Sequence, residues 1–114
     1  MNIKKATSNL MMKKIPEDHS QEQYFFDAST RDWLATVSKS LSNLAIVCCP
    51  SLSVHPLLQN RKDIRFFDMD TRFPRIEPFD LNYPKYMGEF DSLIIDPPFF
   101  NFPLIKIRKC VDIF

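Results

Sequence analysis

The chain has 114 residues, a formal net charge of +1 and 45% hydrophobic residues, including 11 phenylalanines. This is the size and composition of one folded domain, and the near-neutral charge gives no general reason to expect a nucleic-acid partner. The single glycine excludes the Gly-x-Gly-x-x-Gly turn and the Walker loop, which each need several glycines. No apolar run reaches the length of a membrane span, so we expect no membrane partner.

The three cysteines, Cys48, Cys49 and Cys110, are odd in number, and the first two are adjacent in an apolar run. We interpret them as reduced core residues of a cytosolic or nuclear protein, and not as a disulfide framework or a metal site. Cytoplasmic localisation is therefore our prediction, with no metal bound.

The polar, aperiodic residues 1–20 predict a flexible N-terminal arm, and residues 21–114 predict the folded domain. A helix is expected from about Ser29 to Leu41, capped by Asp27 or Ser29. Its predicted buried face carries four apolar residues at helical spacing, Trp33, Leu34, Val37 and Leu41.

The continuous apolar run at residues 44–49 predicts a buried strand, and residues 64–68, Ile-Arg-Phe-Phe-Asp, predict a second strand that ends in an acid. After the first, Pro50 and Ser51 begin a turn, and Ser51 or Ser53 can cap a short helix that carries Val54, Leu57 and Leu58. A proline-rich link follows the second strand, with a short strand expected near residues 76–79. Its predicted anchors in the core are Phe73, Phe79 and Tyr83.

The last apolar run, residues 92–95, has no polar alternation and predicts a strand covered on both faces. Pro97 and Pro98 end it because neither has an N–H to donate. Asp96 is thereby left at the carboxyl end of a strand, where open α/β sheets bind ligands. Beyond it, Leu104, Ile105 and Val111 give residues 101–114 only a weak helical pattern.

The segment Asp96-Pro97-Pro98-Phe99 suits chemistry on an amino group. A carboxylate and the carbonyls of a rigid turn can accept the amino hydrogens, and an aromatic face can stack on a purine or hold a lysine side chain. The alternative is a turn that merely closes a core strand. The segment resembles the (Asp/Asn/Ser)-Pro-Pro-(Tyr/Phe/Trp) motif of amino-group methyltransferases that use S-adenosylmethionine.

The resemblance extends over about residues 21–100, because the segments 23–30, 46–51, 66–73 and 79–84 match in order. It is to the eukaryotic group of probable N6-adenine methyltransferases. The member that this chain resembles most is the elongation factor 1-alpha lysine methyltransferase, and a related zinc-knuckle protein methylates adenine in ribosomal RNA.

The resemblance implies an α/β fold, a partial Rossmann-like class I methyltransferase sheet of about three to four mostly parallel strands with flanking helices. It implies S-adenosylmethionine as cofactor, with Pro50 and Ser51 against its methionine portion. Asp68 would accept its ribose hydroxyls, and Asp80 would border its adenine. The implied catalytic residues are Asp96, Pro97, Pro98 and Phe99. The alternative for Asp68 is that it only begins a turn, with Asp70 and Arg72 pairing structurally.

The resemblance implies an enzyme, and we expect an S-adenosylmethionine-dependent methyltransferase whose target is a protein lysine on a translation-factor-like partner. The absence of zinc-binding cysteines and of a basic surface favours this target over nucleic acid. The alternatives are an N6-adenine methyltransferase of RNA or DNA, and a non-catalytic remnant. The remnant reading follows because the strands that normally come after Phe100 are missing, so the chain looks C-terminally truncated. A partner could then cover the sheet edge left open.

Overall fold

Four parallel strands form the centre of the molecule. The computed structural model describes residues 15–19, 25–98 and 102–114. The strands are β1 (Leu44–Val47), β2 (Ile64–Asp68), β3 (Ile76–Pro78) and β4 (Ser92–Ile95). Their order is β3-β2-β1-β4, and each neighbouring pair is parallel. This is the strand order with which doubly wound sheets begin, so the predicted Rossmann-like α/β fold is confirmed.

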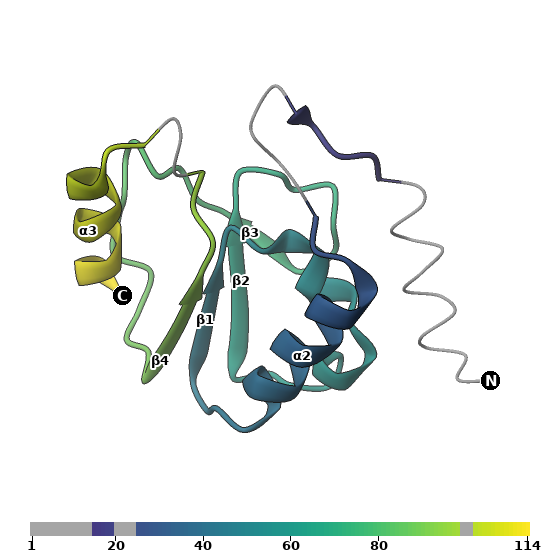
Figure 1. Ribbon diagram of the computed structural model, residues 1–114. Coiled ribbons are helices and arrows are strands. Elements are labelled where there is room, and N and C mark those ends of the chain that lie inside the picture. The colour runs from purple at the N-terminus through teal and green to yellow at the C-terminus, as the bar shows by residue number, and fades with distance from the viewer. Residues whose placement is uncertain (1–14, 20–24, 99–101) are drawn as a thin grey trace.

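Helical segments and a long link cover the two faces of the sheet. On one face, Leu44, Ile46 and Phe66 pack with α2 (Ala28–Lys39) and with η2 (Pro50–Val54) and η3 (Pro56–Leu58). On the other face, Val47 and Phe67 pack with the link after β3 and with α3 (Leu104–Ile113). Figure 1 shows α2 and α3 on either side of the strands. Because both faces are covered, the strands carry apolar residues at consecutive positions.

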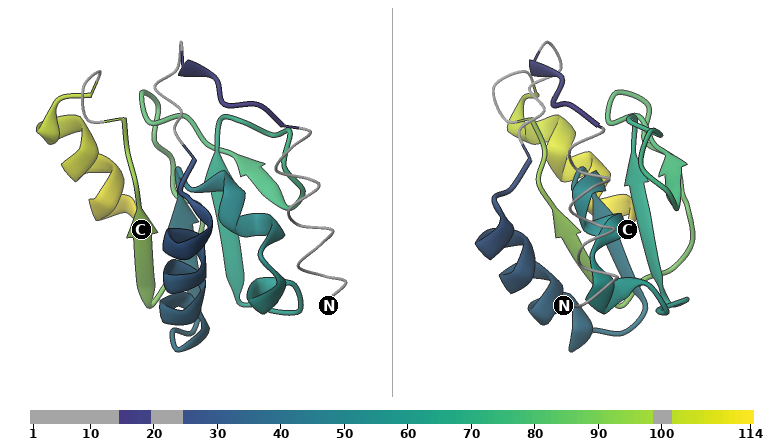
Figure 2. Two further views of the ribbon diagram at one scale, coloured as in Figure 1. Left: turned by 45° about the vertical axis from the view of Figure 1, so that its right-hand side comes forward. Right: turned by 90° about the vertical axis from the view of Figure 1, so that its right-hand side faces the viewer.

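The helix α2 runs from the carboxyl ends of the strands back toward their amino ends (Figures 1 and 2). It begins at Ala28, with Asp27 as N-cap: the Asp27 carboxylate accepts the Thr30 N–H at 2.8 Å. Ser29 therefore lies inside the helix and does not cap it. The prediction for Trp33 was also wrong, because its side chain is 65% exposed. The helix face toward the sheet contains the fully buried Ala35 and Ser38. Trp33, two residues before Ala35, points to the opposite side of the helix.

The connection after β1 differs from the predicted short helix. The strand ends at Val47 because Cys48 takes a φ of +64° and redirects the chain. The 3-10 turns η2 and η3 follow, and η2 has no capping serine, since Cys49 precedes it without a side-chain bond. At η3, His55 is the N-cap: its Nδ1 accepts the Leu57 N–H at 3.2 Å.

The link and the C-terminal segment hold two further corrections. Phe73 and Phe79 are buried as predicted. Tyr83 is 80% exposed, because it lies in a turn in which its backbone N–H donates to the Asp80 carbonyl. The weak helical pattern is a regular helix, α3, but the apolar residues that suggested it are exposed. The residues that α3 buries are Ile107 and Cys110.

The strand β4 lies at the edge of the sheet and is half-buried along its whole length. Both of its faces make core contacts, because Ile94 packs against one cluster and Leu93 and Ile95 pack against the other.

Most of the predicted arm, 1–20, lies outside the described residues. Its Ile15 is buried with Val54 and Phe73. Among the described segments, no helix is long and apolar enough to cross a membrane.

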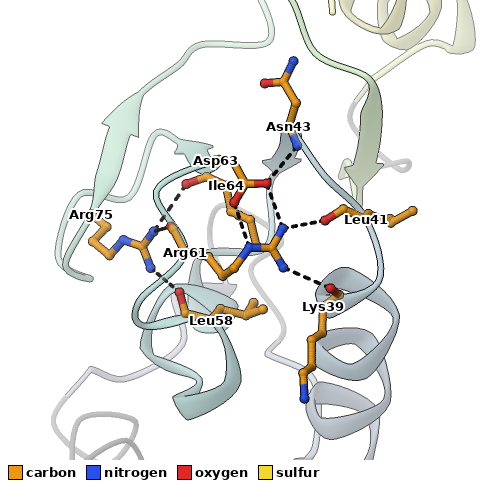
Figure 3. A network of polar contacts seen from close by, with 8 residues as sticks. All are labelled: Lys39, Leu41, Asn43, Leu58, Arg61, Asp63, Ile64 and Arg75. Atoms are coloured by element: carbon orange, nitrogen blue, oxygen red, sulfur yellow. Dashed lines mark hydrogen bonds and ion pairs between the residues drawn. The ribbon is translucent and has the colours of Figure 1, made fainter.

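At the amino end of the sheet, two arginines bind backbone carbonyls of the surrounding segments (Figure 3). The Arg61 guanidinium donates to the Lys39 and Leu41 carbonyls at the end of α2 and to the Asp63 carboxylate. Arg75 donates to three carbonyls, those of Leu58, Arg61 and Ile64. The polar groups at this end are therefore used to hold α2, β1 and β2 together. The side chains suited to bind a ligand lie at the opposite end.

Candidate active site

The carboxyl ends of β2, β1 and β4 bring the predicted residues to one edge. Val47 is in register with Phe67 on one side and with Ile95 on the other. The next residues along these strands are Asp68, Cys48 and Asp96, so Cys48 lies between the two acids. Backbone bonds continue the register, with Cys48 N–H donating to the Phe67 carbonyl and Asp96 N–H to the Val47 carbonyl. With strands about 4.8 Å apart, the Cα atoms of the two acids are about 10 Å apart.

This edge is also the topological switch point of the sheet. From β1 the chain moves outward to β2 and β3, and then returns to place β4 on the other side of β1. In open α/β sheets, ligands bind outside the carboxyl ends of the strands where the order reverses in this way. Here that position is between the ends of β1 and β4, where Cys48 and Asp96 lie.

The two acids face the same side of the sheet. Phe66 and Ile94 pack against the α2 side, and side chains two residues apart on a strand share a face. Asp68 and Asp96 therefore also point toward the α2 side, where Cys49 is buried. Burial raises the pKa of the Cys49 thiol, and the nearby carboxylates of Asp96 and Asp68 raise it further. Both carboxylates are therefore close enough to Cys49 to raise the pKa of its thiol.

Asp68 is a partly buried acid with an elevated pKa. Burial raises its pKa from 3.8 to about 6, against the opposing effect of backbone hydrogen bonds. Its Oδ2 accepts the Asp70 N–H at 3.1 Å, so it does begin a turn. Within that turn Asp70 pairs with Arg72 at 2.8 Å, which is the structural pair that the sequence suggested.

Asp96 is half-buried, and burial raises its pKa. Pro97 is buried beside it, and the Pro98 carbonyl accepts the Phe102 N–H at 3.2 Å. This bond joins the residue before the undescribed segment 99–101 to the residue after it. Phe99 lies outside the described residues.

Pro50 and Ser51 form the first turn of η2 and are both buried. Their side chains are packed in the core, so a ligand at this edge would meet the backbone of the turn. The left-handed φ of Cys48 gives the chain the sharp change of direction that a glycine usually supplies at such a loop. Sequence reasoning missed this, because cysteine carries no preference for that conformation.

Asp80 reaches the same edge from the other side of β2. The Phe79 N–H donates to the Asp68 carbonyl at 3.0 Å, which extends the pairing of β3 with β2 by one residue. Asp80 follows, between the buried Phe79 and Leu81, and its Oδ1 accepts the Asn82 N–H at 2.8 Å. The structure thus brings the Pro50–Ser51 turn, Asp68, Asp80 and Asp96 to one edge. Within the described part of the chain, no three His, Cys, Asp or Glu side chains form a metal-binding group.

The donor set at this edge fits a nucleoside-containing cofactor. Asp68 offers a partly buried carboxylate that can accept hydrogen bonds from hydroxyl groups. The backbone of the turn after β1 can contact an extended part of the same ligand. The family described as probable N6-adenine methyltransferase matches residues 17–112. This chain belongs to that family. The match includes all of α3 except its last residue, so the methyltransferase family accounts for the segment after β4 as well as for the sheet.

No curated protein and no solved structure matches the chain. Membership of the probable N6-adenine methyltransferase family therefore rests on the family match and agrees with the strand order. The predicted closeness to the elongation factor 1-alpha lysine methyltransferase is not confirmed by any relative.

Proposed function

We propose that the chain is an S-adenosylmethionine-dependent N-methyltransferase. The observation that carries the proposal is the placement of two partly buried carboxylates, Asp68 and Asp96, on either side of the turn after β1. Asp68, at the end of β2, is at the position expected for a cofactor ribose. Asp96 follows β4, the strand on the other side of the switch point. Membership of a methyltransferase family supports the same reading.

Four residues would hold the cofactor. Asp68 would accept hydrogen bonds from the ribose hydroxyls, and Asp80 would border the adenine. The Pro50–Ser51 turn would lie against the methionine portion. When bound, the cofactor supplies an electrophilic methyl group on sulfur. The chain would contribute mainly by positioning the two reactants and by excluding water.

Asp96 would orient the target amine. Its carboxylate accepts an N–H of the amine, which directs the nitrogen lone pair away from the acid and toward the methyl group. Because burial raises the pKa of Asp96, this carboxylate is a better proton acceptor than an exposed aspartate. Pro97 and Pro98 would keep the acid in place, and Phe99 would form a wall of the target pocket.

The charge at this edge favours a protein lysine as the target. Asp68, Asp70, Asp80 and Asp96 lie at or just beyond strand ends, and Arg72 is paired with Asp70. Such an edge attracts an ammonium group and repels a phosphate backbone. We therefore propose a lysine on a translation-factor-like protein, in the cytoplasm, where the three free thiols would stay reduced.

The second candidate is N6-adenine methylation of RNA or DNA, which the family description favours. In that case the target base would have to be unstacked to reach Asp96.

Incubation of the full chain with a cell extract and radiolabelled S-adenosylmethionine tests the target class. We expect label that protease removes and nuclease leaves. Label removed by nuclease would instead support adenine. If folded protein gives no label and binds no cofactor, the chain is a non-catalytic module, and its open β4 edge is then the surface to test for partners.

A further inference from the structure

The side chain of Arg31 holds a buried donor with no acceptor. Its Nε is inaccessible to solvent and has no hydrogen-bond partner. An unpaired buried donor is costly, and the cost is larger for a charged group. A guanidinium cannot reduce this cost by losing its proton. An orphaned arginine nitrogen in a folded chain therefore indicates a missing acceptor.

The position of Arg31 places that donor beside the candidate active site. Arg31 lies four residues before Ala35 and seven before Ser38, the two fully buried residues of α2. Residues at this spacing share one helix face, so Arg31 lies on the face that packs on the sheet. It is in the first turn of α2, which begins at the carboxyl ends of the strands (Figure 1).

A contact from the neighbouring residue fixes this part of the helix. The Asp32 Oδ1 lies 2.8 Å from the His55 Nε2, which ties the first turn of α2 to the chain leaving η2. The Pro50–Ser51 turn begins η2, so α2 and this turn belong to one packed unit. The Arg31 side chain therefore lies on the same side of the sheet as Asp68, Asp96 and the turn.

Within the described residues, no carboxylate forms an ion pair with Arg31. Asp27 lies one helical turn before Arg31, and its pKa is lowered chiefly by hydrogen bonds from Thr30 and Ser29 and to a smaller extent by the Arg31 charge. Asp27 is nevertheless occupied as the N-cap, accepting from the Thr30 N–H and the Ser29 hydroxyl. An arginine presents a planar fork of donors that matches a carboxylate. An anionic group entering this otherwise acidic edge would also need a cation.

We propose that Arg31 binds the α-carboxylate of the methionine portion of the cofactor. The inference rests on the proposed function, because it names a further residue of the same site. It explains why a basic side chain is directed inward at the start of α2. It also gives the cofactor a point of attachment at the end opposite to the ribose, which Asp68 would hold.

Calorimetry on the full chain with two ligands tests this assignment. S-adenosylhomocysteine carries the carboxylate, and 5′-methylthioadenosine has the same nucleoside and sulfur but no amino-acid portion. For Arg31→Met, we expect about ten- to a hundredfold weaker binding of S-adenosylhomocysteine, as for loss of a charged hydrogen bond. Binding of 5′-methylthioadenosine should be unchanged. Arg108→Met is the matched control, because Arg108 is exposed on α3, and it should change neither affinity.

The outcomes separate this inference from the proposed function. If S-adenosylhomocysteine binds equally well to Arg31→Met, or if both ligands weaken equally, Arg31 does not bind the carboxylate and only the inference fails. If the folded wild-type chain binds neither ligand, the proposed function fails with it. Thermal melting shows whether Arg31→Met folds. Should it not fold, Arg31→Lys, which keeps the charge but loses the fork, should weaken S-adenosylhomocysteine alone.

Discussion

Replacing Asp96 by alanine is expected to reduce the rate of methyl transfer by about a hundredfold or more, the usual contribution of a positioned acid or base. The chain should still fold and bind S-adenosylhomocysteine. The Asp96 backbone N–H bonds to Val47 and does not need the side chain. Only the group that orients the amine and accepts its proton is lost. Single-turnover transfer of a radiolabelled methyl group, measured beside calorimetry, gives both readouts.

The control for this variant lies just before the same strand. Asp91 immediately precedes β4 at its amino end, where its side chain is exposed. Asp91→Ala should transfer methyl groups at the wild-type rate. Label accumulating equally fast in Asp96→Ala and in the wild type would show that Asp96 does not have the role assigned to it.

Replacing Asp68 by asparagine is expected to change stability and cofactor binding in opposite directions. The pKa of Asp68 is about 6 in the folded chain and 3.8 in the reference state. The folded chain therefore holds this proton more tightly, and the free energy of unfolding falls as pH rises from about 4 to about 6. Above that range the buried charge costs on the order of 2 to 3 kcal/mol. Asparagine removes the charge, so Asp68→Asn should be more stable than the wild type at neutral pH.

The same variant should lose affinity for the cofactor. An asparagine oxygen can still accept the Asp70 N–H, but the side chain no longer offers two charged acceptors to the ribose hydroxyls. We expect about tenfold or weaker binding of S-adenosylhomocysteine, as for loss of a hydrogen bond to a charged group. A variant that gains stability and loses binding cannot be explained by damage to the fold.

The pH dependence supplies the check on Asp68. The stability difference between Asp68→Asn and the wild type should be present at neutral pH and vanish below about pH 4, where Asp68 is protonated in both states. Asp112→Asn, an exposed change on α3, should show neither effect. A lower melting temperature for Asp68→Asn at neutral pH would contradict the assigned pKa, and unchanged cofactor affinity would contradict the assigned role.

The sheet could be predicted from the sequence because apolar residues dominate β1, β2 and β4. β2 was predicted with its observed ends, and β1 was predicted two residues too long because nothing in Cys48 indicates a left-handed φ. Surface contacts were less predictable. Trp33 and Tyr83 are large aromatic residues that usually pack inside, yet the small Ala35 and Ser38 define the inward face of α2, and Tyr83 lies in a turn.

The two central acids could be found because each follows an apolar run, so each had to lie where a strand ends. Parallel pairing on both sides of β1 then brings Asp68 and Asp96 to one edge. Arg31 could not be found in this way. A single arginine in a polar helix normally points to solvent, and only the packed structure shows its Nε buried without an acceptor. The helix α3 was underestimated because its buried residues, Ile107 and Cys110, are few.

Mapping of S-adenosylhomocysteine by amide chemical shifts in the full ¹⁵N-labelled chain tests the central claim most directly. We predict the largest shifts at the carboxyl edge of the sheet, at the amides of Cys49, Ser51, Asp70 and Asp96. The amides of Asn43 and Asp63, at the amino edge, should stay in place. Shifts that gather at the amino edge or on α3, or a folded chain whose spectrum does not change, would contradict the account.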